Sequence, residues 1–320
     1  MNTGKIFMAF AKGQETVDNV AIVKRYTGVA SCYVVGVNPN KKELEEIYGT
    51  TIENEPEYRS SVEVDGRKVE NVRIDFIVKT EPEDNNGIEM ISKVALFLRK
   101  EYRYNKEKTK VQVIDKYGRT AWVTIDQAKA KEIPMYANGP ANLDADYRPC
   151  FVGEEELTNF LKAYLSIPNV NEYKNNQWVP NSKVSSPNDC IARLDNIDKY
   201  FSGNYDELRD AIAFQPKNRV KILFGVKTND EGKQYQAVFT QMFLKNGVRD
   251  YSKLEKELAA RKVAGAYPTT EFTVGDLKEY NPQPTSFAAP AENVGNPFAD
   301  NPFGDTVDPL ASMASNPWEM

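Results

Sequence analysis

The sequence predicts a mixed α+β body, built on an antiparallel barrel or bent sheet with added helices, followed by a disordered acidic tail. Three observations support this. Segments of alternating apolar and polar residues fill much of the first 125 residues. Clear helical periodicity begins only near residue 153. After residue 280, Pro, Ala, Asn, Gly and Ser dominate, with too few apolar residues for a core. We therefore expect a body over 1–280 and a tail over 281–320.

The first strands are predicted by alternation and by turn residues. Val29–Val37 is β-branched and aromatic, and the stretch around Asp65-Gly66 has a strong hairpin signal. Lys93–Tyr104 and a second hairpin, Lys110–Ile125, follow. Because five or six strands fall within about a hundred residues with no regular helix expected between them, we favour a small OB-like barrel or bent sheet over a βαβ sheet.

Three helical stretches are expected in the second half. Gly153–Ile167 has acids in its first turn and apolar residues at helical spacing, which predicts an amphipathic helix. A second stretch, Asn188–Phe214, is expected to break at Ser202-Gly203. Asp250–Gly265 is the last predicted helix. We interpret residues 126–215 as a helical insertion into the body.

One further hairpin lies between these helices, over residues 219–246. Its two halves flank the polar loop TNDEGK, and Val220, Ile222, Phe224 and Val226 share one face. Sequence alone leaves two placements open. The hairpin completes the first sheet across the insertion, or it begins a second domain.

Residue types exclude several classes of function. The 320 residues include no histidine, so a Ser-His-Asp triad, a Cys-His pair and a His-containing zinc site are excluded. The phosphate-cradling patterns GxxxxGK[ST] and GxGxxG are also lacking. Acids at Glu154–Glu156 fit a helix start better than a metal site, and Asp144 and Asp146 lie in a loop without a matched partner. We expect a protein that is no enzyme and needs no cofactor or metal.

Cysteine spacing and hydropathy indicate a cytoplasmic protein. Cys32, Cys150 and Cys190 are far apart and odd in number, which argues against a disulfide framework. The mean hydropathy is −0.58, and no apolar run approaches the roughly 18 residues of a membrane span. The N-terminus lacks a signal-peptide pattern. We expect no membrane partner, and a location in the host bacterial cytoplasm if a phage encodes the protein.

The negative charge of the chain belongs to its tail. All 41 basic residues precede residue 281, whereas five of the 46 acidic residues follow it, so the tail accounts for the whole formal charge of −5. A body of zero net charge permits a basic groove balanced by acids elsewhere. The sequence pI of about 5.2 therefore does not exclude a polyanionic partner.

The stretch Phe97–Val123 combines cations with aromatic rings. A single-stranded nucleic-acid groove needs both, because cations neutralise phosphates and each base stacked on a ring contributes about 1–3 kcal/mol. The alternative is an ordinary solvated face. The candidate binding residues are Arg99, Lys100, Tyr102, Arg103, Tyr104, Lys106, Lys110, Lys116, Tyr117, Arg119 and Trp122.

The alternation of side chains along the strand predicts which face of the sheet carries Trp122. Ala121, Val123 and Ile125 share the expected core face, which leaves Trp122 on the opposite, polar face between two threonines. There it would be a stacking platform, unless it covers a second core or a helix.

Two weaker basic-aromatic patches accompany this stretch. The first is Lys24, Arg25 and Tyr26, and the second surrounds the late hairpin at Lys221, Lys227, Lys233 and Tyr235. We expect them to contribute only if the fold brings them to one groove, since lysines near turns usually serve solubility.

The tail repeats a short aromatic motif. Asn-Pro initiates turns, so each copy presents one ring on a solvated chain, as a docking motif for partner proteins does. The alternative is a sticky tail without a role. The motif residues are Asn296, Pro297, Phe298, Asn301, Pro302 and Phe303, with Pro317 and Trp318 in a third, NPW copy.

A β-rich body followed by an acidic tail with Pro-Phe resembles single-stranded DNA-binding proteins, and the length and the stretch GEEELTNFLKAYLSIPN are similar to the phage-type helix-destabilising proteins. The resemblance implies an OB core with added helices and a role in replication, recombination and repair. It also implies that the tail recruits replication and recombination proteins, and that it can occupy the DNA groove. A zinc site held by Cys and His, known in a T-even phage member, has no counterpart here. Self-association on DNA stays open.

A different class of function is a structural or interaction protein. Eukaryotic endocytic adaptor domains also recognise NPF tripeptides, and a virion protein could use an aromatic tail for assembly. Salt dependence separates the two classes, because single-stranded DNA affinity falls steeply with ionic strength.

Overall fold

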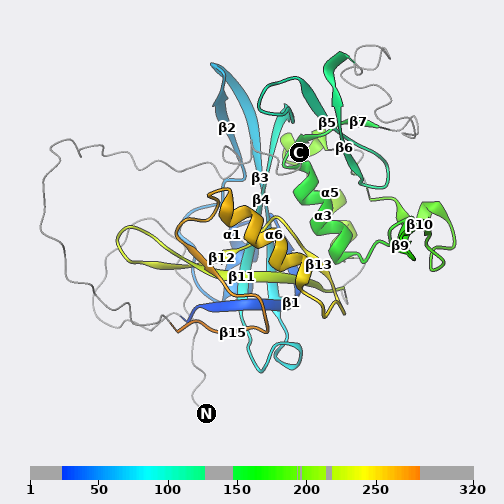
Figure 1. Ribbon diagram of the computed structural model, residues 1–320. Helices are drawn as coiled ribbons and strands as arrows, with labels where there is room; N and C mark the ends of the chain where they lie inside the picture. The colour runs from blue at the N-terminus through cyan, green and yellow to red at the C-terminus, as the bar shows by residue number, and fades with distance from the viewer. Residues whose placement is uncertain (1–23, 127–146, 193, 195–196, 214–217, 282–320) are drawn as a thin grey trace, which may run out of the picture.

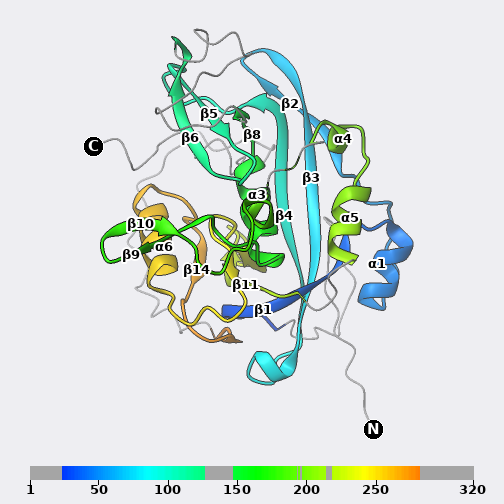
Figure 2. The same ribbon diagram turned by 90° about the vertical axis from the view of Figure 1, so that its right-hand side faces the viewer.

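The computed structural model describes residues 24–126, 147–192, 194, 197–213 and 218–281. It has a mixed α+β fold in which a long, curled antiparallel sheet carries helices on both faces (Figures 1 and 2). The main sheet has the strand order β12-β11-β1-β3-β4-β8, with the other four strands paired to members of this series. The strands of this sheet are β1 (Tyr26–Val37), β2 (Arg59–Val64), β3 (Arg67–Thr80), β4 (Ile91–Tyr102), β8 (Phe151–Val152), β11 (Val220–Thr228), β12 (Gln234–Val238), β13 (Leu244–Lys245), β14 (Thr270–Phe272) and β15 (Lys278–Glu279).

Two smaller sheets lie beside it. One has the order β6-β5-β7 and the other is a β9–β10 hairpin. Their strands are β5 (Lys110–Ile114), β6 (Thr120–Thr124), β7 (Arg148–Pro149), β9 (Asn171–Lys174) and β10 (Gln177–Pro180). The helices are α1 (Lys41–Tyr48), α3 (Glu154–Tyr164), α4 (Asp198–Phe201), α5 (Asp206–Ala213) and α6 (Ser252–Val263), with short 3₁₀ turns at Pro82–Asp84 and Pro187–Cys190.

The predicted hairpins are confirmed. β2 and β3 turn at Asp65-Gly66, where both residues have positive φ, and β5 and β6 join through the turn that contains Gly118. The late hairpin β11–β12 pairs with β1, so it completes the first sheet rather than beginning another. Its four expected core residues, Val220 to Val226 in alternation, are all buried.

The expectation that no helix interrupts the first strands was wrong. α1 lies between β1 and β2. Asn40 and Glu43 form a reciprocal capping box at its start, and Gly49 ends it in a left-handed conformation. The segment 126–215 contains strands β7 to β10 besides α3, α4 and α5. The stretch expected to be helical over Asn188–Phe214 is a 3₁₀ turn and two short helices.

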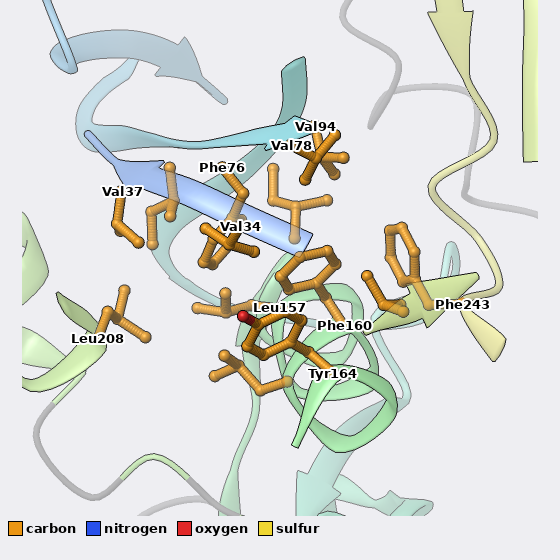
Figure 3. Close-up of a cluster of buried hydrophobic side chains, with 14 of the residues drawn as sticks. Val34, Val37, Phe76, Val78, Val94, Leu157, Phe160, Tyr164, Leu208 and Phe243 are labelled. Atoms are coloured by element: carbon orange, nitrogen blue, oxygen red, sulfur yellow. The ribbon is translucent and has the colours of Figure 1, made fainter. Parts of the chain in front are cut away.

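The main core lies between the concave face of the curled sheet and α3 (Figure 3). Leu157, Phe160 and Tyr164 of α3 point at side chains of β1 and β3, and the rings of Phe76 and Phe160 stack at 4.2 Å between centroids. A bulge in β1 between Val34 and Gly36 shifts the alternation, so that Val34 and Val37 both reach this core. α6 covers the other face of β1 and β11 through Leu254 and Leu258.

Gly153 sets the distance between α3 and β4. It has a φ of +87°, and an added Cβ would lie 1.7 Å from the carbonyl oxygen of Phe97. Gly232, with a φ of +76°, has open space around the same position. The two glycines therefore share a left-handed backbone conformation, but only Gly153 has no room for a side chain.

We expect Gly153→Ala to destabilise the body more than Gly232→Ala does. Both changes carry the left-handed cost of roughly 1–2 kcal/mol, and only the first adds overpacking of about 1–3 kcal/mol. Denaturant unfolding of the two variants measures the difference. Equal losses would show that α3 shifts away from β4 at no cost.

Candidate nucleic-acid interface

The acidic first turn of α3 binds the small β6-β5-β7 sheet. Glu155 accepts hydrogen bonds from Arg103 at 2.9 Å, from Gln112 at 3.0 Å and from Thr120 at 2.8 Å. Glu156 adds a second carboxylate 3.6 Å from Arg103. The Arg103 side chain is only 18% exposed, so its charge stabilises the fold rather than facing solvent. It was expected to contact phosphate.

A second ion pair fixes the same corner. Glu154 is fully buried, and it accepts hydrogen bonds from Arg148 of β7 and from the Phe151 amide. Arg148 also donates to the Leu194 carbonyl at 2.8 Å. The acids of the first turn thus bind the groups that surround the start of α3. Burial raises the pKa of the Glu156 carboxyl. No trio of acidic or Cys residues in the described ranges is placed to hold a metal.

Three further predicted residues also have structural surroundings. Tyr102 and Tyr104 pack against a small core of Val111, Val113, Val123 and Tyr147, and the Tyr102 ring lies 5.3 Å from that of Phe151. Arg99 is mostly buried, 3.9 Å from Glu101. The two rings therefore contribute chiefly to joining β4 with the small sheet, whereas the Arg99 guanidinium lies near a carboxylate of its own strand.

Three lysines of the stretch, Lys100, Lys106 and Lys110, precede the β5–β6 turn and lie outside it. Lys100 pairs with Glu70 at 2.8 Å, and its ammonium lies 5.7 Å from the Phe201 ring. Lys106 is exposed and Lys110 half-buried. The neighbouring Lys108 pairs with Asp65 in the β2–β3 turn, so acids accompany cations in this part of the stretch.

Trp122 lies on the expected face of β6, opposite the buried Val123. This face meets α3 rather than open solvent, because its neighbours Thr120 and Gln112 both bond Glu155. Trp122 itself is half-buried. The alternative weighed for this ring, that it covers a helix, fits the arrangement better than a free stacking platform does.

The β5–β6 turn carries the predicted residues that do reach a cleft. Arg119 lies 5.1 Å from the Tyr117 ring centroid and Lys116 lies 5.3 Å from it. The turn packs on α3 at Gly118, where an added Cβ would lie 2.7 Å from Thr158 and 3.3 Å from the Lys162 stem. The glycine thus lets the turn approach the helix closely.

The cleft lies between this turn, the C-terminal half of α3 and the β9–β10 hairpin. Its volume is about 370 Å³. Two aromatic rings and two cationic side chains contribute to its walls, and the other lining residues are short polar or apolar ones. The lining residues are Tyr117, Arg119, Lys162, Pro168, Asn169, Val170, Asn171 and Trp178.

Positive charge exceeds negative charge at this cleft. Arg119 donates to Asp115 at 2.5 Å, and the same carboxylate accepts from the Tyr117 and Arg119 amides. The Lys162 ammonium has no hydrogen-bond or ion-pair partner among the described residues. Burial lowers the pKa of Lys162, and the charges of Lys245 and Arg119 lower it further, while the Asp115 carboxylate partly offsets them. An anion in the cleft would relieve this repulsion.

The β9–β10 hairpin presents two exposed rings. Tyr173 and Trp178 are cross-strand partners, 59% and 71% exposed, with centroids 5.4 Å apart. The expected elements did not include this hairpin. Its signal was Asn175-Asn176 between aromatic residues, and both asparagines have the positive φ of a tight hairpin turn.

The two weaker basic-aromatic patches meet each other but not the cleft. Arg25 donates twice to the Gln234 carbonyl of β12, beside Tyr235. Lys221 points inward, to the Val248 carbonyl and the Tyr251 hydroxyl. The β12 hairpin and the β9–β10 hairpin lie on opposite sides of the molecule (Figure 1).

Some predictions fall outside the described residues: the tail motifs from Asn296 to Trp318, and the acids Asp144 and Asp146. No described helix has the length and apolar character needed to cross a bilayer. Comparison with family models, curated proteins and solved structures gave no match.

We expect Glu155→Ala to destabilise the body by about 1.5–3 kcal/mol, because it leaves Arg103 without its main hydrogen-bond acceptor. Denaturant unfolding measures the loss. Glu107→Ala is the control, since Glu107 is exposed and bonds only the Asn105 side chain among the contacts described, and we expect a change within about 0.5 kcal/mol. Equal stability of the two variants would contradict the role given to Glu155.

Proposed function

We propose that the body binds single-stranded DNA without sequence preference, at the cleft between the β5–β6 turn and the β9–β10 hairpin. One observation carries the proposal. Two rings and two cations, Tyr117, Trp178, Arg119 and Lys162, line one cleft although they come from three separate segments. A groove for single strands needs this combination, because bases stack on rings of any sequence context and phosphates bind cations.

The chemistry of the cleft favours binding without base discrimination. Ring faces accept all four bases, whereas discrimination needs hydrogen-bond donors and acceptors aimed at base edges. Besides its rings and cations, the cleft is lined by four neighbouring loop and strand residues, of which only Asn169 and Asn171 carry hydrogen-bonding side chains. We propose a binding role rather than a catalytic one, in replication, recombination or repair.

The fold supports the same proposal at a coarser level. A strongly curled antiparallel sheet with a helix across its open side is compatible with an OB-like barrel, a fold that commonly binds single strands. In the phage-type proteins that the sequence resembles, such a body is joined to an acidic tail. We propose that residues 281–320 recruit replication and recombination proteins through the NPF copies.

We expect poly(dT) to quench the intrinsic Trp and Tyr fluorescence of the full chain, with an affinity that falls steeply as salt rises. Tyr117→Ala should weaken binding by about 1–3 kcal/mol, the value of one lost stack. A titration at low and at high salt measures both effects.

Tyr235→Ala is the matched control, because Tyr235 is an exposed ring on a hairpin far from the cleft. We expect it to bind as the unchanged protein does. Wild-type protein that binds neither poly(dT) nor poly(U) would favour the structural or interaction class instead. Tighter binding of poly(U) than of poly(dT) would support the cleft as the binding site but would make RNA, rather than DNA, its ligand.

Deletion of 281–320 should tighten binding of single-stranded DNA, most visibly at low salt. The tail carries five acids and no cation, and a tether of about forty residues keeps it near the body at a millimolar effective concentration. Comparing the titrations of full and truncated chains tests this. Identical affinities would leave the tail as a docking segment only, and weaker binding after truncation would mean that the tail itself contacts DNA.

A further inference from the structure

We propose that Lys162 and Trp178 form a subsite for one nucleotide, in which the Lys162 ammonium binds a phosphate and the Trp178 ring stacks on the adjoining base. This inference rests on the proposed function and assigns each wall of the cleft a separate part of the ligand. It also predicts that these two residues, both outside the stretch 97–123, govern affinity.

Lys162 is the cation in the cleft that lacks an anion. It projects from α3 and is partly covered by the β5–β6 turn, since its stem touches the position of Gly118. In the described ranges its ammonium has no carboxylate or carbonyl acceptor. Three other cations lie near the cleft, Arg119, Lys116 and Lys245, and the Lys245 ammonium already donates to the Ile167 carbonyl at 2.5 Å. A phosphodiester would supply the missing negative charge.

Arg119 has a different role in the same cleft. Its guanidinium is bound to Asp115 and lies over the Tyr117 ring, so its charge is largely compensated and its position fixed. A phosphate would have to compete with a carboxylate 2.5 Å away. The Lys162 ammonium bonds no carboxylate among the described residues, and Asp115, whose charge acts on it, is already bound to Arg119, so Lys162 is the stronger phosphate ligand.

Trp178 supplies the ring for the base. It is 71% exposed, although it is the largest apolar side chain of its hairpin, and it forms a wall of the cleft beside Lys162. The base of the hairpin is closed by Asn181, which donates to the Asn169 carbonyl at 3.0 Å and to the Val170 carbonyl at 2.9 Å. The ring is thus held at the cleft mouth rather than on a loose loop.

The lining of the cleft favours one nucleotide over an acidic side chain, and its volume can hold one. Its 370 Å³ lies at the small end of the about 300–1,000 Å³ usual for ligand sites. An acidic side chain would satisfy Lys162 but would leave the Trp178 ring without a flat partner. A nucleotide offers an anion and a flat aromatic face joined by one sugar.

The test uses the full chain with Lys162→Met and Trp178→Ala, titrated with oligo(dT) and with an abasic oligonucleotide of equal length. Lys162→Met should lower the salt slope of binding by about 0.7, the value of one phosphate contact on a single strand, for both ligands. Trp178→Ala should weaken oligo(dT) binding about 5- to 150-fold and leave abasic binding unchanged. Trp178→Phe should restore most of the loss.

Two controls match these variants. Lys174→Met removes a cation of the same hairpin that is paired with Glu172 at 2.6 Å, and Tyr235→Ala removes a distant exposed ring. Neither should change the slope or the affinity measurably. Circular dichroism and denaturant unfolding check that each variant is folded.

The outcomes separate the subsite from the proposed function. If folded Lys162→Met and Trp178→Ala bind oligo(dT) as the unchanged protein does, the subsite is wrong while DNA binding stands. If Trp178→Ala weakens abasic and oligo(dT) binding equally, the ring does not hold a base and the assignment is also wrong. A wild-type chain that binds neither ligand removes both proposals.

Discussion

The placement of the candidate interface depends on the carboxylate of Glu155. It binds Arg103, Gln112 and Thr120, and so attaches the small sheet to the start of α3. Lys162 lies seven residues later, which is two helical turns or about 10 Å along the same face. The β5–β6 hairpin runs over this distance and sets its turn beside Lys162, where Gly118 permits close contact. An interaction at one end of the helix thereby determines the geometry of the cleft at the other.

Buried ion pairs are a costly way to join two sheets. Desolvation of Glu154, which pairs with Arg148, and of Arg103, which pairs with Glu155, offsets much of the Coulomb attraction in each pair, and apolar residues of similar size could stabilise the contact as well. Charge-assisted hydrogen bonds, however, form only between particular partners at particular angles, whereas apolar surfaces can pack against each other in several positions. Arg148 of β7 binds Glu154, and Gln112 of β5 and Thr120 of β6 both donate to Glu155, so each strand of the small sheet is held to the start of α3. We infer that the corner is built for position more than for stability.

Local sequence predicted the elements better than it predicted their partners. The β2–β3, β5–β6 and β11–β12 hairpins follow from alternation and turn residues, and so does the parity of Trp122. α1 was missed although Asn40, Glu43 and Gly49 carry its capping signals, because the strands around it dominated the pattern. The role of Arg103 could not be predicted, since its acceptors are about fifty residues away in the chain. The Tyr173–Trp178 hairpin was short and lay in a segment expected to be helical.

The structure also changes the interpretation of the basic residues in 97–123 as phosphate ligands. A count of cations suggests a long phosphate track, but Lys100, Arg103 and Arg119 each already lie against a carboxylate. A phosphate gains little from a cation that it must share with an acid, because the net charge it meets is near zero. Lys162, which was outside the predicted stretch, bonds no carboxylate in the part of the chain that the structure describes, and Asp115, whose charge acts on it, already binds Arg119. Affinity for a single strand would then depend more on a few stacking rings and one or two uncompensated cations than on the density of basic residues.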